Sequence, residues 1–388
     1  MHSVMNYEGD LDSFNAIKNL KSSLKYGDKE NIQNPWITVF IPTFNRVKLL
    51  EQSINSVLKQ EHCDFEWDLI VVDNEEDDGK VNETERLIRQ INSPRILYYR
   101  NSFHVRPGDN FNNGLMLARG EWVCFLHDDD ILISDSLRRI GNLIKELKDY
   151  NRKPLGAISA KYHQFTYVPE SDKSLENLAW LDEFYKNQPL YYGLYRLTHA
   201  NIWFTANIGG DVPSNGTTYN RKAALNSGGF NEDFGISGDL ILFYRMENKY
   251  SVYASAQPLG LYRWGSNTMI KPESTKRVIR DGYDFREYVY HKNMFTRIMG
   301  CALRRCHTKQ FESEVIEAKN KSLDKKKRIR IEDFQTKECK PPTRIGYVFY
   351  RLVWQNSYYR HKRRQCIRLH KQISSEMKLR AIKKDMFT

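Results

Sequence analysis

Residues 36–46 read WITVFIPTFNR, and this stretch decides the fold. Its first six residues are apolar or β-branched, Pro42 closes the run and polar residues follow, which is the pattern of a short buried strand. In the next segment, 49–58, apolar residues recur at the spacing of one helix face. They are Leu50, Ile54, Val57 and Leu58. The sequence therefore predicts a strand, a turn and a helix.

The same alternation continues along the chain. Strands are predicted at 69–72, 96–99 and 121–126, and helices at 83–91, 112–118 and 134–147. Strands that alternate with helices favour a mostly parallel sheet with helices on both faces. The predicted fold class is therefore α/β, with a Rossmann-like sheet.

Polar and acidic residues follow these strands at the points where the strands end. Thr43 and Asn45 follow the first strand, Asp73 follows the second, and three aspartates at 128–130 follow the fourth. In open α/β sheets, ligands bind at the carboxyl ends of the strands. We therefore expect a binding site at this edge of the sheet.

The acidic triplet at 128–130 comes directly after an apolar strand. Adjacent carboxylates repel one another unless a positive charge lies among them. Mg²⁺ or Mn²⁺ would supply that charge, because hard carboxylate oxygens suit these ions and leave positions open for the phosphates of a nucleotide. The alternative is an acidic turn that caps the helix beginning near Ser134. Asp73 and the loop 74–78 could likewise serve only as a turn at the strand end.

Taken together, these patterns resemble the family 2 glycosyltransferases, which have the GT-A fold. The matching pieces are 36–46 (WITVFIPTFNR), 56–60 (SVLKQ), 69–74 (LIVVDN), Asn112-x-Gly114, Ala118-x-Gly120 and 125–130 (FLHDDD). The resemblance covers about residues 36–268. It implies a transferase that uses a nucleotide sugar and inverts the anomeric centre.

The resemblance also implies roles for individual residues. It places the nucleotide sugar against Pro42, Thr43, Asn45, Arg46, Asp73, Asn74, Asn112 and Asp128. It implies that Asp129 is the principal contact of a Mn²⁺ or Mg²⁺ ion, with Asp130 in support. The common motif of the family is Leu-Asp-x-Asp-Asp, and His127 stands where the motif has its first Asp. We expect His127 to be structural or to face the nucleotide.

A second group of residues, 227–245, reads SGGFNEDFGISGDLILFYR. In the resembled family this stretch carries a Glu-Asp pair before a helix, and the Asp is the general base. Here the pair is Gly238-Asp239. The resemblance therefore assigns the catalytic role to Asp239. An alternative from the residues alone is that Asp239 caps the helix that it opens.

The charge of the chain is concentrated at one end. The whole sequence has 60 Lys and Arg against 48 Asp and Glu, a net charge of +12. Residues 301–388 hold 24 and 9 of these, a net charge of +15, which leaves −3 for residues 1–300. A basic segment on a nearly neutral body indicates an anionic partner.

Residues 340–388 are where this partner is expected. Apolar residues fall on one face of a predicted helix among many Lys and Arg: Ile345, Val348, Phe349, Leu352, Val353 and Tyr359. This pattern is typical of a helix that lies on an anionic membrane surface. Packing of the helix on the body is the second reading, and binding to nucleic acid is the least favoured.

The predicted organisation has three parts. They are an N-terminal extension at 1–35, helical or loose, a GT-A domain at 36–270, and a basic α-helical region at 271–388. Within the GT-A domain, 36–135 would bind the nucleotide sugar and 155–270 the acceptor. No apolar run approaches the length of a membrane span, and the N-terminus lacks the pattern of a signal peptide. We therefore expect a cytoplasmic protein that is peripheral on the inner face of the cell membrane.

The expected function is that of an inverting hexosyltransferase in cell-envelope polysaccharide synthesis. It would move a sugar from a nucleotide sugar, with a UDP-sugar as the default, to a saccharide or a lipid-linked saccharide. The alternative is a non-catalytic protein of the same fold that binds a sugar or a polyanion. The departures at His127 and Gly238 are the sequence features that keep this alternative open.

Overall fold

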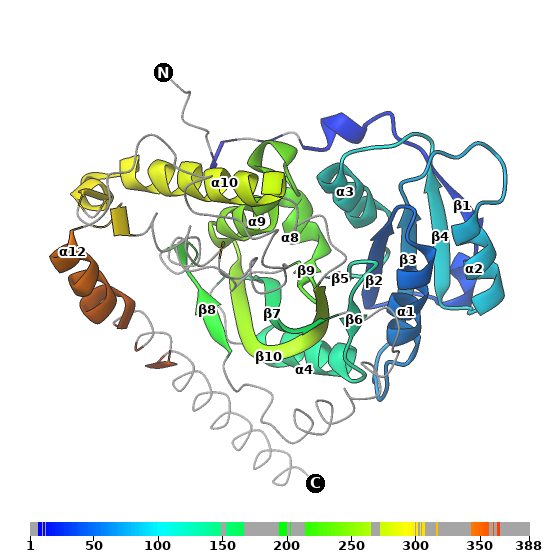
Figure 1. Cartoon of the computed structure of the whole chain (residues 1–388). Helices are drawn as coiled ribbons and strands as arrows, with labels where there is room; N and C mark the ends of the chain where they lie inside the picture. Colours follow the sequence, from blue (N-terminus) through cyan, green and yellow to red (C-terminus); the bar gives the residue numbers. More distant parts are fainter. Residues whose placement is uncertain are drawn as a thin grey trace, which may run out of the picture.

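The structure is a computed structural model of the chain (Figure 1). It describes residues 7–9, 11, 13–148, 153–166, 194–199, 202, 214–264, 272–298 and 343–356, and isolated residues between 300 and 364. Residues 160–220 are rich in Tyr, Phe and Trp, and most of them lie outside the described residues. The same is true of most of the basic region 340–388.

One mixed sheet forms the centre of the molecule. Its ten described strands run in the order β1-β4-β3-β2-β5-β9-β7-β10-β6, and β8 pairs with β10. Their bounds are β1 Ser22–Tyr26, β2 Ile37–Thr43, β3 Trp67–Asp73, β4 Ile96–Asn101, β5 Trp122–Phe125, β6 Ile131–Leu132, β7 Leu155–Thr166, β8 Tyr195–Leu197, β9 Thr218–Asn220 and β10 Ser251–Trp264. The block β4-β3-β2-β5 is parallel, as is the pair β7-β10, whereas β9 runs antiparallel to both of its neighbours. The prediction of an α/β fold is confirmed.

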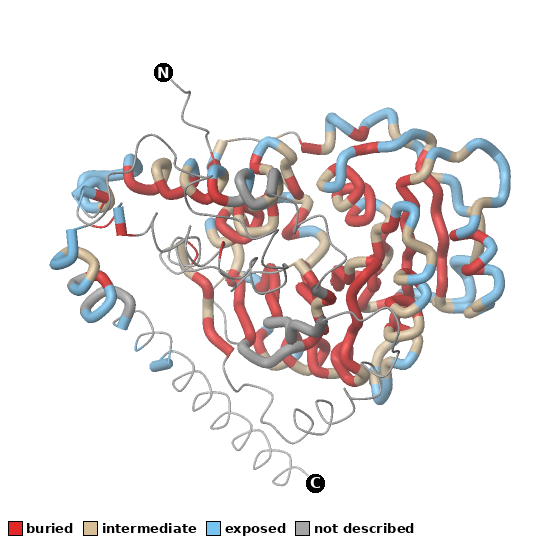
Figure 2. Tube along the Cα trace, viewed as in Figure 1, coloured by how far each residue is buried: buried red, intermediate tan, exposed pale blue. Residues whose placement is uncertain are grey.

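Helices cover both faces of the sheet. Their bounds are α1 Val47–Leu58, α2 Glu83–Ile91, α3 Pro107–Leu117, α4 Ser136–Lys148, α8 Arg221–Asn226, α9 Gly238–Glu247, α10 Pro272–His291 and α12 Arg344–Phe349. The alternation of side chains along β2 explains the two layers. Val39 and Ile41 pack with α1, α2 and α4 in one apolar cluster, and Phe40 packs with α3, α8, α9 and α10 in the other. Figure 2 shows the resulting buried centre.

The expectation of a helical or loose N-terminal extension is wrong for its described part. Residues 22–26 form an edge strand, β1, that pairs antiparallel with β4. Tyr7 is buried, and its ring lies 5.0 Å from that of Phe234 and 5.2 Å from that of Phe285. This segment is therefore part of the folded body and contacts the elements around α9.

The strand β6 determines where the acidic triplet lies. It pairs antiparallel with β10, with Leu132 opposite Gly260 and Ile131 opposite Leu261. The triplet at 128–130 thus turns from the end of β5 toward the end of β10. In the part of the chain that the structure describes, no helix combines the length and the apolarity needed to cross a membrane.

Candidate active site

The candidate site lies where the carboxyl ends of β2 and β3 meet the acidic triplet. Parallel pairing aligns the two strands up to Thr43 and Asp73, and β2 also pairs with β5 up to Phe125. The Thr43 hydroxyl donates a hydrogen bond of 2.9 Å to Oδ2 of Asp128. The end of β2 and the acidic triplet therefore share one edge of the sheet.

Arg46 is the cation that bridges this edge. It occupies the N-cap position of α1, and its Nη1 lies 3.2 Å from Oδ1 of Asp128 and 2.9 Å from Oδ2 of Asp129. Both carboxylates are buried, whereas the Arg46 side chain is partly exposed. A guanidinium between two carboxylates offsets their repulsion, so Arg46 stabilises the cluster and can also reach a ligand outside it.

Burial raises the pKa of two of the three carboxyls. It raises the pKa of Asp128 to about 6, although the Arg46 guanidinium acts in the opposite direction. The pKa of Asp130 lies well above its ordinary value, because this carboxyl is buried and Asp129 is adjacent to it. Carboxyls that retain protons in this way indicate a cluster that is short of positive charge.

Arg263 on β10 anchors the triplet from the other side. Its backbone N–H donates to Oδ1 of Asp130 at 2.8 Å, and its Nε donates to the carbonyl of Asp129 at 2.7 Å. Its Nη2 donates to Oε1 of Gln52 on α1 at 2.6 Å. Arg263 therefore ties the triplet to β10 and to α1. The sequence analysis assigned no role to this residue.

The donors at this edge fit a hard divalent cation. The Oδ2 atom of Asp130 is buried and has no hydrogen-bond partner among the described residues, and the cluster is short of positive charge. Within that same part of the chain, no three His, Cys, Asp or Glu side chains are grouped closely enough to hold an ion by themselves. An ion here would complete its shell with water and ligand oxygens, as Mg²⁺ usually does.

Asp130 presents one carboxylate oxygen, Oδ2, that no described residue hydrogen-bonds. Its side chain is fully buried, and Oδ1 is held by the Arg263 backbone. Asp128 and Asp129 are the carboxylates that Arg46 joins at the edge of the sheet. We therefore keep Asp129 as the predicted principal ligand and assign Asp130 the supporting position beneath it.

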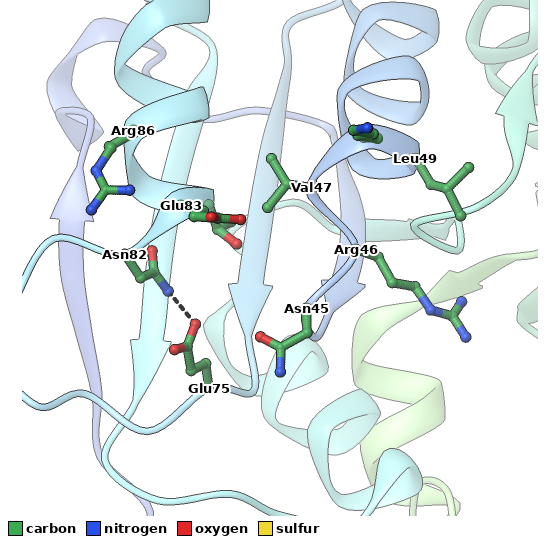
Figure 3. Close-up of a pocket in the computed structure, with 10 residues that line it drawn as sticks. Asn45, Arg46, Val47, Leu49, Glu75, Asn82, Glu83 and Arg86 are labelled. Carbon is green, nitrogen blue, oxygen red and sulfur yellow. Dashed lines mark hydrogen bonds between the residues drawn. The ribbon is translucent and has the colours of Figure 1, made fainter.

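A cavity of about 710 Å³ opens beside the cluster. It lies between the start of α1 and the start of α2, and its lining residues are Asn45, Arg46, Val47, Lys48, Leu49, Glu75, Asn82, Glu83, Thr84 and Arg86. Figure 3 shows Glu75 and Asn82 hydrogen-bonded to each other, with Arg46 directed to the opposite side. A cavity of this size is typical of small-molecule sites, and two helix N-termini favour an anionic ligand.

Two residues near the end of β2, Pro42 and Asn45, have different positions relative to this cavity. Asn45 is exposed and lines it, with a φ of 54° that places the backbone in the left-handed region. Asparagine tolerates that region better than most residues. Pro42 is within β2 opposite Val72, and it is not among the lining residues. Of these two, Asn45 is the one with direct access to a ligand.

Asp73 does not reach the cavity itself. Its Oδ1 accepts from the Glu75 N–H at 3.0 Å, and its Oδ2 accepts from Asn82 Nδ2 at 3.0 Å and from the Tyr98 hydroxyl at 2.8 Å. The side chain is fully buried, and burial raises its pKa. Asp73 therefore positions Asn82, which lines the cavity. The sequence analysis missed both Asn82 and Glu75.

Asn74 is also engaged within the protein. Its Nδ2 donates to the Val105 carbonyl at 2.7 Å, and its Oδ1 accepts from the Val105 N–H at 3.0 Å. The side chain is buried. These contacts fasten the segment before α3 to the end of β3. They use both ends of the Asn74 amide, and the nucleotide contact of Asn74 stays a prediction.

Asn112 on α3 has a comparable structural role. Its Nδ2 donates to the Phe230 carbonyl at 2.7 Å, and its Oδ1 accepts from the Phe230 N–H at 2.8 Å. Its side chain is fully buried. A Cβ on Gly229 would lie 2.3 Å from Oδ1 of Asn112, and Gly229 has a φ of +63°, so only glycine fits there. Asn112 therefore fastens the loop before α9 to α3 with both ends of its amide, and its contact with a nucleotide stays a prediction.

Asn112→Ala is expected to destabilise the fold. The substitution leaves the buried N–H and carbonyl of Phe230 without partners, which costs about 2–4 kcal/mol. Urea unfolding followed by circular dichroism measures this cost. The control is Asn226→Ala, because the Asn226 side chain bonds the Tyr250 hydroxyl at the surface and its loss should cost under about 0.5 kcal/mol. Equal midpoints for the two variants would contradict the assignment.

Asp239 lies in the first turn of α9, after the 3₁₀ helix η3 (Glu232–Ser237). The N-cap position belongs to Ser237, so Asp239 is not the capping residue. Its Oδ1 accepts from the adjacent Leu240 N–H at 2.7 Å. Burial raises the pKa of Asp239 to about 7, although the residue keeps partial exposure. A partly accessible carboxyl with this pKa suits a general base near neutral pH.

The environment of Asp239 connects to the acidic edge through aromatic rings. The Asp239 charge contributes to the raised pKa of Tyr219 on β9, next to β5. The Tyr219 ring lies 5.3 Å from Phe125 and 5.8 Å from Phe230. Phe125 ends β5 and directly precedes the segment that carries the aspartates. A single aromatic layer thus supports both parts of the candidate site.

His127 is held at the end of this layer. Its Nε2 lies 2.7 Å from the Ser214 hydroxyl, and its ring packs edge-on against Phe111 at 5.8 Å. Burial lowers its pKa, which favours the neutral imidazole. These contacts support a structural role for His127. The residue lies next to the acidic cluster and is not a part of it.

Comparison with known proteins identifies the domain. Residues 38–185 match the model of glycosyl transferase family 2, and this segment contains the cavity, Arg46 and the acidic triplet. This part of the chain belongs to glycosyltransferase family 2. The resemblance seen in the sequence, and with it the GT-A fold class, is confirmed for this family 2 domain.

Curated relatives of the family 2 domain include named glycosyltransferases. The chain is 33% identical to the GalNAc(5)-diNAcBac-PP-undecaprenol beta-1,3-glucosyltransferase of Campylobacter jejuni, over 42% of this chain and 60% of the relative. It is 35% identical to the abequosyltransferase RfbV of Salmonella typhimurium, over 26% of this chain and 30% of the relative. The match therefore spans less than two thirds of these relatives.

Among solved structures, the mannosyltransferase PcManGT from Pyrobaculum calidifontis, in complex with GDP-Man and Mn²⁺, aligns with a TM-score of 0.47. The alignment covers 76% of this chain and 77% of that protein at 15% identity. No conclusion about the family 2 domain rests on this likeness.

Proposed function

We propose that the chain transfers a hexose from a nucleotide sugar to a hydroxyl of an acceptor, with inversion of the anomeric centre. One observation carries the proposal: a buried acidic cluster, bridged by a partly exposed Arg46, lies beside a cavity of about 710 Å³ at the carboxyl edge of the sheet. This arrangement suits a ligand that has both a nucleoside and a diphosphate.

The nucleoside is proposed to occupy the cavity, with the diphosphate toward the acidic cluster. Arg46 and Lys48 line the α1 side of the cavity, where they can neutralise phosphate oxygens. Glu75 and Asn82 line the other side, where they can accept and donate hydrogen bonds to a base or a ribose. A UDP-sugar is the donor to test first.

A divalent cation, Mn²⁺ or Mg²⁺, is proposed to be held by Asp129 together with Asp128. When bound, it would neutralise the charge that develops on the diphosphate leaving group. Asp130 and Arg263 position the two ligand carboxylates from beneath. Arg46 contributes a second positive charge on the same side.

Asp239 is proposed to accept the proton of the acceptor hydroxyl. The acceptor oxygen then forms a bond to the anomeric carbon, while the bond from that carbon to the diphosphate oxygen breaks. The proton remains on the Asp239 carboxyl and the nucleoside diphosphate leaves with the bonding electrons. A base with a pKa near 7 can accept a proton and release it to solvent afterwards.

A saccharide linked to a lipid is the proposed acceptor class. The Campylobacter jejuni relative is named for such a substrate, an undecaprenol-linked saccharide. On this basis we propose that the reaction belongs to the synthesis of cell-envelope polysaccharide. The proposed location is the cytoplasmic face of the membrane, with residues 340–388 against anionic lipid.

The rate of transfer is expected to rise with pH and to level off above about pH 7. The raised pKa of Asp239 means that its carboxyl is protonated below about 7 and can act as a base only above that value. The measurement is kcat/KM for the donor and acceptor between about pH 5.5 and 8.5. A profile that is flat across this interval would contradict Asp239 as the base.

A further inference from the structure

The segment that follows α10 exposes apolar side chains to an unusual degree. Met294 is 79% exposed, Phe295 is 71% exposed and Ile298 is 59% exposed. Figure 2 shows that α10 carries buried residues among intermediate and exposed ones and that the chain becomes exposed beyond its end. Three large apolar residues within five positions form a patch and not a scattered surface feature.

A second segment has the same property. Ile345 on α12 is 85% exposed, Val348 is 53% exposed, and Leu352, in the π-helical turn that continues α12, is 63% exposed. The spacing of these residues places them along one side of the helix. The other exposed large apolar residues of the described chain lie singly on five separate elements or loops. They are Leu24, Phe44, Val81, Phe103 and Met116.

The second segment packs against residues that lie shortly after the first segment in the sequence. Tyr350, at the end of α12, is fully buried against Leu303 and Cys306, which follow the first segment in sequence. This cluster is separate from the two apolar clusters of the sheet. Tyr350 packs in this small cluster, whereas Ile345 is exposed to water. Packing on the body therefore does not explain the exposed apolar side of α12.

Positive charge surrounds both apolar groups. Residues 292–306 contain four Lys and Arg and no Asp or Glu, and residues 343–364 contain six and none. Arg297 stands between Phe295 and Ile298 in the sequence, and it is exposed. Lys292 pairs with Glu8 of the N-terminal segment, and the other cations have no acidic neighbour in the same segment.

We propose that Met294, Phe295 and Ile298, together with Ile345, Val348 and Leu352, form a docking surface that inserts into the interface of an anionic membrane. The apolar side chains enter the acyl boundary and the flanking cations meet the lipid phosphates. The assignment deepens the proposed function, since it explains how the enzyme meets a lipid-linked acceptor. It also adds the segment 294–298, which the sequence pattern had not indicated.

Other partners match these residues less well. Nucleic acid would satisfy the cations but would leave side chains that are 53–85% exposed without an apolar partner. A symmetric contact between two copies would bury the apolar groups but would bring the same arginines of both copies together. An anionic lipid surface satisfies both the charge and the apolar area.

The test is sedimentation of the full-length protein with vesicles of phosphatidylcholine, with and without phosphatidylglycerol. Wild-type protein is expected to bind the anionic vesicles and to retain part of this binding at high salt, because salt screens only the charges. The variant Met294→Ser/Phe295→Ser is expected to bind at least about tenfold more weakly. Met116→Ser is the matched control, because Met116 is 51% exposed on α3 and should not change binding.

Three results would overturn the proposal. They are wild-type protein that does not bind anionic vesicles, a double variant that binds them as tightly as the wild type, and a wild-type dimer that the double variant converts to a monomer. Release of nucleoside diphosphate in the absence of vesicles is measured in parallel. It should be equal in all of these proteins, so a failure of docking is distinguishable from a failure of the proposed transferase activity.

Discussion

Asp239→Asn is expected to lower sugar transfer by a factor of about 10² to 10⁴ while the affinity for the donor persists. The amide is nearly the same size as the carboxyl, and its oxygen can still accept from the Leu240 N–H. It cannot take the proton of the acceptor hydroxyl. The loss should therefore appear in kcat and not in the dissociation constant of the nucleoside diphosphate.

The stability of this variant separates a catalytic role from a structural one. Because the pKa of Asp239 is raised from 3.8 in the unfolded chain to about 7 in the fold, ionisation of the wild-type carboxyl lowers the stability of the fold as the pH rises between these two values, and the loss is complete above about 7. The asparagine variant lacks this penalty, so it should be at least as stable as the wild type at about pH 8. The control is Asp233→Asn, an exposed neighbour in η3, which should keep full activity. Unchanged transfer by Asp239→Asn would remove Asp239 from the mechanism.

Asp129→Ala is expected to abolish turnover of the donor, with a loss of at least about 10² in rate, and to remove the dependence of UDP binding on Mn²⁺. The substitution takes away the predicted principal ligand of the cation. It also leaves Arg46 with only Asp128 as a carboxylate partner. Calorimetric titration with UDP, with and without Mn²⁺, measures the binding.

Two further proteins make this result interpretable. Asp129→Asn keeps an oxygen that can accept from Arg46, so it should fold like the wild type but still lose metal-dependent binding. Asp64→Ala removes an exposed carboxylate that pairs with Lys145 far from the cluster in sequence, and it should change neither property. Full turnover by Asp129→Ala would contradict the metal assignment.

The first half of the fold was predictable because local pattern and burial coincide there. The strand within 36–46 and the helix at 83–91 have the residue patterns of elements that bury one or both faces. The helix at 83–91 is α2, and it has the predicted bounds. Helix α3 begins at Pro107, earlier than predicted. Proline fits the first position of a helix, because the backbone N–H that it lacks has no partner within the helix there.

The N-terminal residues were not predictable in the same way. β1 is a short edge strand with polar and apolar residues mixed, and its stability comes from β4 and not from its own pattern. Tyr7 is buried only because Phe234 and Phe285, far along the sequence, form the site that it fills. A local pattern carries no information about such partners.

The candidate site shows the same division. The types of residue at strand ends indicated a binding edge, and Thr43, Arg46 and Asp128 do meet there. The sequence could not show that the amides of Asn74 and Asn112 hydrogen-bond backbone groups of distant loops. An asparagine has the same hydrogen-bonding capacity for a nucleotide as for a peptide group, so only the fold decides between them.

The lining of the cavity was missed for a related reason. Glu75 belongs to an acidic loop that is indistinguishable from a solvated turn in the sequence, and Asn82 is the N-cap of α2. The structure brings them together through the hydrogen bond between their side chains. A capping residue can therefore also line a ligand cavity.

The central claim is tested most directly by the release of nucleoside diphosphate from a panel of UDP-, GDP-, CDP- and dTDP-sugars. Wild type, Asp129→Ala and Asp239→Asn are compared with Mn²⁺ and a lipid-linked saccharide acceptor. The account predicts that the wild type turns over at least one donor, that Asp129→Ala turns over none, and that Asp239→Asn binds that donor but transfers about 10² to 10⁴ times more slowly. Wild-type protein that binds these donors or saccharides and releases no nucleoside diphosphate would contradict the account and establish the non-catalytic alternative.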